Sequence, residues 1–243
     1  MQYTIENEYL RLTVDTRGAE AVSAVNKATG AEMLWCGDPA VWGRHAPILF
    51  PYTGKLTGGK MIAKGKEYAG GQHGFARDME HALVEQSGDS VTLCLEANVL
   101  TMEKFPFAFK LFSTFRLEGV TVHHDIRVEN DGGEVMPFAF GYHPAFLCPF
   151  DAAHKAEDYV LRFDTPQTPT VIDGREPFHC GKRDGPPRER GDRRLPLCAD
   201  VERKRPCPLC VHRAVARLAG RAHGQRHLGG EARHGAPCAW RKL

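Results

Sequence analysis

The sequence lacks any uninterrupted apolar stretch long enough to cross a membrane, which takes about 20 residues. Residues 1–8 are polar and acidic, which is not the pattern of a secretory signal peptide. Cysteine is scarce in the first 174 residues, where Cys36, Cys94 and Cys148 stand singly. This scarcity excludes a dense disulfide framework and indicates free thiols in a reducing compartment. We therefore expect a cytoplasmic protein with no membrane partner.

The final 69 residues lack isoleucine, threonine, serine, asparagine, tyrosine and methionine altogether. Isoleucine, threonine and tyrosine build strands, so a natural domain rarely lacks all three. This segment instead holds 14 of the chain's 21 arginines and five of its eight cysteines. The net charge is −8 over residues 1–174 and +10 over residues 175–243, although the whole 243-residue chain carries only +2. We predict one folded domain at 1–174 followed by a basic segment at 175–243.

Three interpretations of residues 175–243 remain open. A GC-rich coding sequence read out of frame produces arginine, proline, glycine, alanine, histidine and cysteine, so a frameshift accounts for the composition. A disordered basic tail has the same low hydrophobicity. A zinc- or nucleic-acid-binding module is the third, since Cys207 and Cys210 have C-x-x-C spacing and His212 follows. No second ligand pair stands at a regular distance, and the arginines lack interleaved aromatics, which disfavours nucleic acid.

Alternating hydrophobicity dominates the first part. Apolar and polar residues alternate in four segments: 10–14, 91–95, 109–117 and 120–128. A period of two is the signature of a half-buried β-strand. Turn-forming residues such as the Gly70-Gly71 pair separate these segments, with little helical periodicity between them. We therefore predict an all-β fold, a large antiparallel β-sandwich rather than a βαβ fold.

The segment 72–78, QHGFARD, is the first candidate site. Gly74 beside His73 lets backbone and ligand approach closely. Arg77 offers a planar fork for a carboxylate, a phosphate or sugar hydroxyls. The alternative is an ordinary loop in which Arg77 pairs with Asp78.

The segment 138–146, FAFGYHPAF, is the second candidate. Its alternating aromatics predict a strand that leads into a turn at Pro144. His143 at the end of that strand titrates near neutrality, as a general acid should, and aromatic faces pack on the C–H surfaces of sugars. The alternative is a core histidine satisfied by a backbone carbonyl. A third segment, 49–56, by itself predicts only a loop with an exposed Lys55.

The order of these motifs resembles the aldose 1-epimerase (galactose mutarotase) family, in the branch of LacX-type proteins and hexose-6-phosphate epimerases. The resemblance rests on FPYTGK at 50–55, HGFARD at 73–78, FPF at 105–107 and GYHPAF at 141–146, and covers residues 1 to about 173. It implies a galactose mutarotase-like β-sandwich. It also implies exchange of the α and β anomers of a hexose or hexose phosphate by acid–base catalysis, without metal or cofactor.

By the same resemblance, His143 is the general acid on the ring oxygen and His73 hydrogen-bonds the sugar. Lys55 stands near the position of a sugar-binding arginine, and Arg77 belongs to the motif whose arginines grip phosphate in the sugar-phosphate branch. The expected partner is thus a small sugar or sugar phosphate.

The sequence departs from the family in its last third. The family's general base is a glutamate near the C-terminus, preceded by a sugar-binding aspartate, and both are expected after residue 174. The surroundings of Glu231 do not resemble the base's motif, and no other glutamate is assigned. We therefore expect an epimerase whose activity is weak or lost. A non-catalytic carbohydrate-binding sandwich is the alternative.

Overall fold

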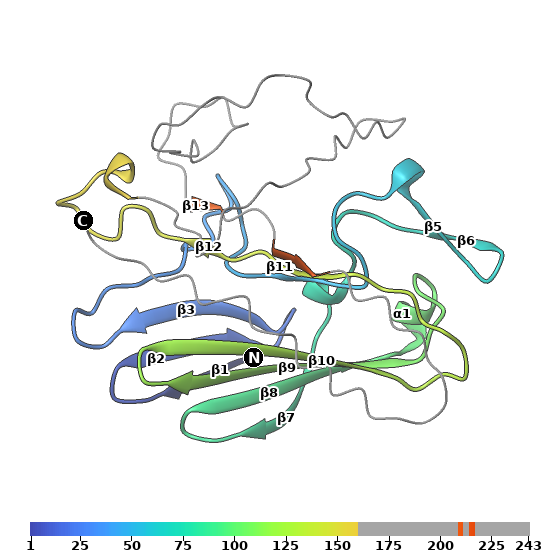
Figure 1. Ribbon diagram of the computed structural model, residues 1–243, viewed down its shortest axis with the longest axis horizontal. Helices are drawn as coiled ribbons and strands as arrows, with labels where there is room; N and C mark the ends of the chain where they lie inside the picture. Colours follow the sequence, from blue (N-terminus) through green and yellow to red (C-terminus); the bar gives the residue numbers. More distant parts are fainter. Residues whose placement is uncertain (160–208, 211–213, 217–243) are drawn as a thin grey trace, which may run out of the picture.

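Antiparallel strands make up nearly all the regular structure of the computed structural model, which describes residues 1–159, 209–210 and 214–216 (Figure 1). The strands are β1 (Gln2–Glu6), β2 (Leu10–Asp15), β3 (Glu20–Asn26), β4 (Ile48–Leu49), β5 (Lys60–Ala63), β6 (Lys66–Ala69), β7 (Ala82–Gln86), β8 (Ser90–Glu96), β9 (Phe109–Glu118), β10 (Thr121–Asn130), β11 (Phe140–Tyr142), β12 (Ala145–Phe146), β13 (Leu209–Cys210) and β14 (Ala214–Ala216). One short helix, α1 (Val99–Met102), and three 3₁₀ turns, η1 (Thr57–Gly59), η2 (Ala76–Asp78) and η3 (Ala156–Asp158), complete the described elements.

Two antiparallel sheets form the first layer. One has the strand order β1-β2-β3 and the other the order β10-β9-β8-β7. The alternation predicted for 10–14, 91–95 and 109–117 is confirmed, because the apolar positions of β2, β8 and β9 are the buried ones. The two sheets meet where the Glu6 N–H donates to the Gly88 carbonyl at 2.8 Å. One core cluster contains side chains from both sheets, among them Leu12, Val91 and Phe115.

The predicted segment 120–128 differs at its start. Val120 belongs to the two-residue turn between β9 and β10 and is 75% exposed, since the paired strands end at Glu118 and Thr121. Gly119 accommodates the turn with a φ of 54°. Further along β10, Ile126 and Val128 pack against a core as expected.

A second layer lies above these sheets (Figure 1). It contains a sheet with the order β14-β11-β4 and the strand pair β12-β13. The second core, which includes Phe50 and Phe140, joins this layer to β8 and β9. Phe105 and Phe107 of the FPF motif belong to this core, so that motif is structural. The predicted antiparallel β-sandwich is therefore confirmed.

Cys36, Cys94 and Cys148 are free thiols. Among the described residues, no helix has the length and apolar character needed to cross a membrane. The predicted boundary at residue 174, and the interpretations of residues 175–243 as frameshifted, disordered, or binding zinc or nucleic acid, lie outside the described residues. The two short strands β13 and β14 are the exception, and only their backbone pairing is described.

Candidate functional site

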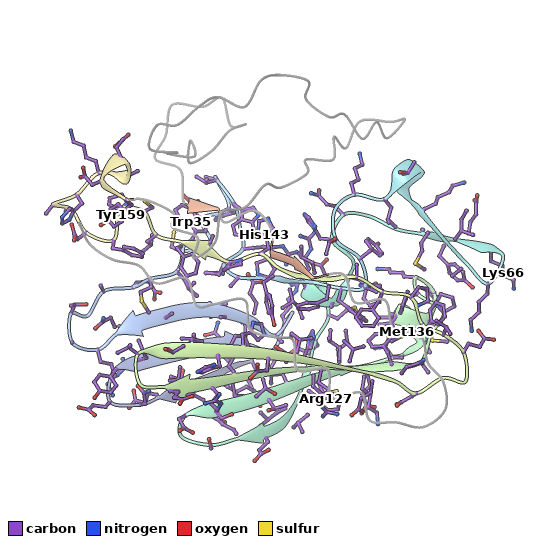
Figure 2. All side chains as sticks on the ribbon, viewed as in Figure 1. Trp35, Lys66, Arg127, Met136, His143 and Tyr159 are labelled. Carbon is purple, nitrogen blue, oxygen red and sulfur yellow. The ribbon has the colours of Figure 1, made fainter. Side chains whose placement is uncertain are left out.

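His143 directly follows β11, where the sequence predicted a strand that ends in a turn. Its backbone N–H donates to the Pro47 carbonyl at 3.0 Å, and the Ala145 N–H donates to the His45 carbonyl at 2.8 Å. These bonds fasten the segment after β11 to the segment that leads into β4. The His143 side chain lies in the second layer (Figure 2), and the residue is 8% exposed.

His73 is held in an unusual backbone conformation by Gly54. The φ of His73 is 69°, in the left-handed region that side chains other than glycine seldom occupy. Its N–H donates to the Gly54 carbonyl at 2.8 Å, and the Gly54 N–H donates to His73 Nδ1 at 3.0 Å. Because Nδ1 accepts a hydrogen bond, the neutral ring carries its proton on Nε2. Nε2 lies 3.0 Å from the side-chain amide of Gln72, of which only the oxygen can accept this proton.

The carbonyl of Phe50 fixes the turn after His73. It accepts hydrogen bonds from the N–H groups of Phe75 and Ala76 at 2.9 and 3.2 Å. A Cβ on Gly74 would lie only 1.9 Å from this oxygen, and the φ of Gly74 is 71°. Only glycine fits here, which explains the Gly74 of the motif. Phe50 and Phe75 are both buried in the second core, so the turn is held by the packing of the two layers.

The His143 ring lies close to two other rings. The centroids of the His73 and His143 rings are 5.7 Å apart, with their planes tilted by 58°. The centroid of the Trp42 ring lies 5.2 Å from that of the His143 ring. The structure thus brings together two of the predicted site residues and adds an aromatic ring. Two imidazoles so placed can move protons to and from one small ligand, because an imidazole nitrogen can either accept or donate a proton.

Arg77 lies in η2, and its guanidinium contacts the loop that precedes η2 in the chain. Nη2 donates to the Gln72 carbonyl at 2.9 Å, and the Arg77 carbonyl accepts from Arg44 Nη1 at 3.2 Å. Arg44 also pairs with Asp78, whereas Arg77 Nε is 3.8 Å from the Asp78 carboxylate. Burial lowers the pKa of Arg77, and the nearby Arg44 lowers it further. Arg44 rather than Arg77 is therefore the main partner of Asp78.

The segment that precedes β4 is held by Glu20, a buried carboxylate on β3. Glu20 Oε1 accepts from the N–H groups of His45 and Ala46 at 2.5 and 2.9 Å. Arg44 Nη1 lies 3.9 Å from Glu20 Oε2. The Glu20 carboxylate thus holds both Arg44 and the backbone of His45 and Ala46, which precede the Pro47 that binds His143.

Lys55 is exposed, and its backbone forms an isolated bridge with Gln72. The structure therefore places Lys55 beside the segment that carries His73 and Arg77. No described contact of its side chain assigns it a ligand.

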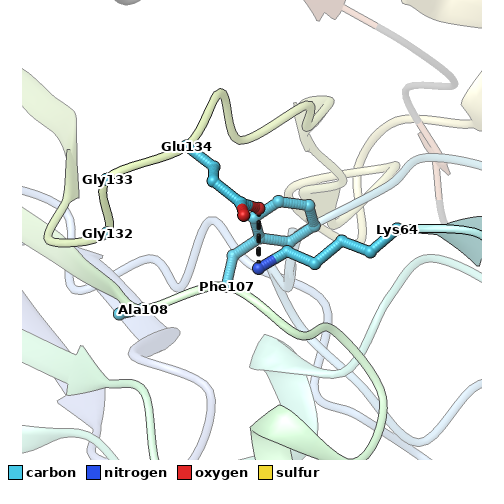
Figure 3. Close-up of a pocket in the computed structure, with 6 residues that line it drawn as sticks. All are labelled: Lys64, Phe107, Ala108, Gly132, Gly133 and Glu134. Carbon is cyan, nitrogen blue, oxygen red and sulfur yellow. Dashed lines mark ion pairs between the residues drawn. The ribbon is translucent and has the colours of Figure 1, made fainter.

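A surface hollow of about 320 Å³ lies elsewhere (Figure 3). Lys64 and Glu134 form an ion pair across it at 2.8 Å, and the Lys64 ammonium lies 5.0 Å from the Phe107 ring centroid. None of the predicted site residues lines it. We do not assign this hollow as the active site because its charges are exposed and already paired.

Sequence reasoning missed Trp42, Arg44 and Glu20. Trp42 lies seven residues after Trp35 in a stretch with no alternation of apolar and polar residues, and no motif marked it. Arg44 and Glu20 resemble ordinary surface charges in the sequence. Only the fold shows that Glu20 is 7% exposed and faces the segment of Arg44.

The fold and the site together define a class: an antiparallel β-sandwich protein in which two histidine rings from distant segments lie 5.7 Å apart. The model of the family described as aldose 1-epimerase matches residues 1–182. The chain therefore belongs to the aldose 1-epimerase family, as the resemblance of the motifs predicted.

The relatives agree with this assignment. The plasmid protein LacX of Lactococcus lactis subsp. lactis is 35% identical over 169 residues, which are 67% of this chain and 56% of the relative. A galactose mutarotase-related enzyme from Lactobacillus acidophilus is 35% identical with a TM-score of 0.66, over 71% of this chain and 56% of that one. A galactose mutarotase-like protein from Lactobacillus casei is 38% identical with a TM-score of 0.66, over 73% and 60%. The chain thus spans a little over half the length of these relatives.

Proposed function

We propose that the site formed by His73 and His143 exchanges the anomers of an aldohexose or its phosphate, which makes the chain an isomerase of the aldose 1-epimerase type. The observation that carries the proposal is the 5.7 Å separation of the two rings, in a β-sandwich whose sequence belongs to that family. The free thiols support a cytoplasmic setting.

His143 is proposed as the general acid. It donates a proton to the ring oxygen of the sugar while a base removes the proton of the anomeric hydroxyl, so the bond between the ring oxygen and C1 breaks and an aldehyde forms. The aldehyde rotates, and the reverse proton transfers close the ring on the other face. His73 orients the sugar through its Nε2 side, where the Gln72 amide now lies 3.0 Å away, since Gly54 occupies Nδ1. Positioned proton transfer contributes a factor of about 10²–10⁴ to a rate.

We further propose that this chain is a slow catalyst. No glutamate of the sequence matches the family's base, and the similarity to LacX covers 56% of that relative. Without the base, the hydroxyl proton must pass to water, which forfeits the gain from a positioned group. Arg77 and Lys55 are proposed to contact the sugar hydroxyls or the phosphate, because both lie beside Gln72, the neighbour of His73. Arg77 donates to the Gln72 carbonyl, and the Lys55 backbone forms a bridge with Gln72.

The test follows anomer exchange directly. The purified chain is added to freshly dissolved α-D-galactose, α-D-glucose or glucose 6-phosphate, and the rate of approach to equilibrium is followed by polarimetry or by the anomeric proton signals in NMR. We expect exchange above the spontaneous rate but well below that of the full-length Lactobacillus acidophilus relative. A rate equal to the spontaneous one for all sugars would contradict the catalytic proposal.

A non-catalytic carbohydrate-binding sandwich is the second candidate. It is supported by the presence of His73 and Arg77 in the described part, while no glutamate of the sequence is assigned as the base. Saturable sugar binding with no anomer exchange would select this candidate over the first.

A further inference from the structure

The loop that carries Trp42 is internally braced. The N–H of Trp42 donates to the Asp38 carbonyl at 2.7 Å, and the N–H of Ala40 donates to the Asp38 carboxylate at 2.8 Å. The indole N–H of Trp35 donates to the Trp42 carbonyl at 2.8 Å. The backbone of Trp42 is therefore fixed on both sides, and this limits where its indole can lie.

The same loop contacts the segment that precedes β4. Gly37 packs against the His45 ring so closely that a Cβ at this position would lie 2.4 Å from the ring. His45 is in turn held by Glu20, and Pro47 two residues later accepts the N–H of His143. The loop of Trp42 is thus linked to the segment of His143 by the packing of Gly37 on His45 and by the hydrogen bonds of His45 and Pro47.

The Trp42 ring is placed unlike the aromatic rings of the core. Phe50 and Phe75 are 0% and 4% exposed, whereas Trp42 is only partly buried. Its centroid lies 5.2 Å from that of His143, with the planes at 44°. A ligand that contacts the exposed part of the Trp42 indole would therefore lie next to the buried ring of His143.

We propose that the indole of Trp42 is the platform on which the apolar C–H face of the hexopyranose packs, so that the ring oxygen meets His143. This inference rests on the function proposed above and extends it to a residue that selects for a rigid six-membered sugar ring. An indole offers a large flat apolar surface at a low cost in side-chain entropy. A cyclic sugar presents one continuous C–H face, whereas an open-chain polyol must first be ordered, at a cost in conformational entropy.

The experiment uses the full chain and two readouts. Binding of D-galactose, D-glucose and glucose 6-phosphate is titrated by calorimetry and by tryptophan fluorescence, with sorbitol as the open-chain control. The chain has three tryptophans, Trp35, Trp42 and Trp240. The variants are Trp42→Leu, which keeps apolar bulk without an aromatic face, Trp42→Phe, which keeps an aromatic face, and Trp240→Phe as the matched control.

We expect a saturable change in fluorescence on addition of the cyclic sugars for the wild type and for Trp240→Phe, and no such change for sorbitol. Trp42→Phe should bind with a Kd within about threefold of the wild type but without the fluorescence change. Trp42→Leu should weaken binding about tenfold, which corresponds to loss of part of a buried aromatic contact.

Each result decides the question. If the wild type binds none of the sugars, the proposed function fails and the platform fails with it. If the wild type binds and Trp42→Leu binds equally well, the platform alone is overturned and the proposed function stands. Should Trp42→Leu not fold, as judged by its thermal unfolding, Trp42→Phe still decides: a fluorescence change as large as that of the wild type would show that the sugar does not contact Trp42.

Discussion

The rings of His73 and His143 lie 5.7 Å apart, although seventy positions separate the two residues in the chain. His73 is fixed by two hydrogen bonds to Gly54, and His143 by its bond to Pro47. Both anchors belong to the segment that surrounds β4. This short strand, paired with β11 in the second layer, is therefore the element that brings the two motifs into one site.

Replacement of His143 by asparagine is expected to lower the rate of anomer exchange by about 10²-fold or more, because the proton donor for the ring oxygen is lost. The sugar Kd should change by less than about threefold, since one of several contacts is removed. The rate is measured from anomeric NMR signals. His123→Gln is the control, because His123 lies on β10 and pairs with Glu118. A wild-type exchange rate for His143→Asn would show that another group supplies the proton.

Gly74→Ala is expected to destabilise the domain by about 3 kcal/mol or more, because its Cβ would lie 1.9 Å from the Phe50 oxygen. Gly65→Ala is the matched control: its φ is also 71°, but nothing lies within 4 Å of the added Cβ. That variant should cost only about 1 kcal/mol from backbone strain. Urea unfolding measures both, and equal costs would refute the close approach.

Glu20→Ala should destabilise the segment before β4 by about 2–4 kcal/mol, because the N–H groups of His45 and Ala46 lose their acceptor. Glu20→Gln keeps an acceptor oxygen and should cost about half as much. The comparison is made by denaturant unfolding. If both variants lose the same stability, the negative charge of Glu20 beside Arg44 matters more than the two hydrogen bonds.

Stability should decrease in mild acid because of His81. This residue is 1% exposed, and burial lowers its pKa from 6.5 to about 4. Its Nε2 has no hydrogen-bond partner among the described residues, so protonation would bury an unpaired charge. Below pH 6.5 His81 becomes protonated in the unfolded chain, whereas in the folded chain it is protonated only near pH 4. The free energy of unfolding should therefore fall by up to about 1.4 kcal/mol per pH unit across this window and be unaffected by this group above it.

His81→Asn is the variant that tests this slope. Its amide can still donate to the Met79 carbonyl, the present partner of His81 Nδ1. Urea unfolding at several pH values between 7.5 and 4 should show a slope smaller by about one proton than in the wild type. A slope remains because burial also lowers the pKa of His124, to about 3. An unchanged slope would mean that His81 takes up its proton at the same pH in the folded and unfolded states.

The composition of residues 175–243 predicts a reading-frame change in the coding DNA. Sequencing of codons 165–243 and translation in all three frames should recover a frame with alternating strand segments and a late aspartate and glutamate. If no frame does so, the basic segment is genuine, and sugar binding without catalysis becomes the favoured function over epimerase activity.

The strands and their faces were predictable because period-two alternation is a local signal that requires no partner. The burial of Leu12, Leu93 and Leu111 follows directly from it. The start of β10 was misplaced at Val120 because alternation does not reveal where a hairpin turns. The positions of His73, Lys55, Arg77 and His143 came from the order of the motifs, but their roles remain predictions.

By itself, the sequence determined the all-β class, the family and the residues with the chemistry of an acid–base site, since each of these depends on local pattern or on motif order. Only the tertiary structure decided that Trp42 stands beside His143 and that Glu20 holds the chain beneath them. The physical reason is that these contacts join segments separated by many residues and form only when the two layers pack. No periodicity along the chain encodes such an approach.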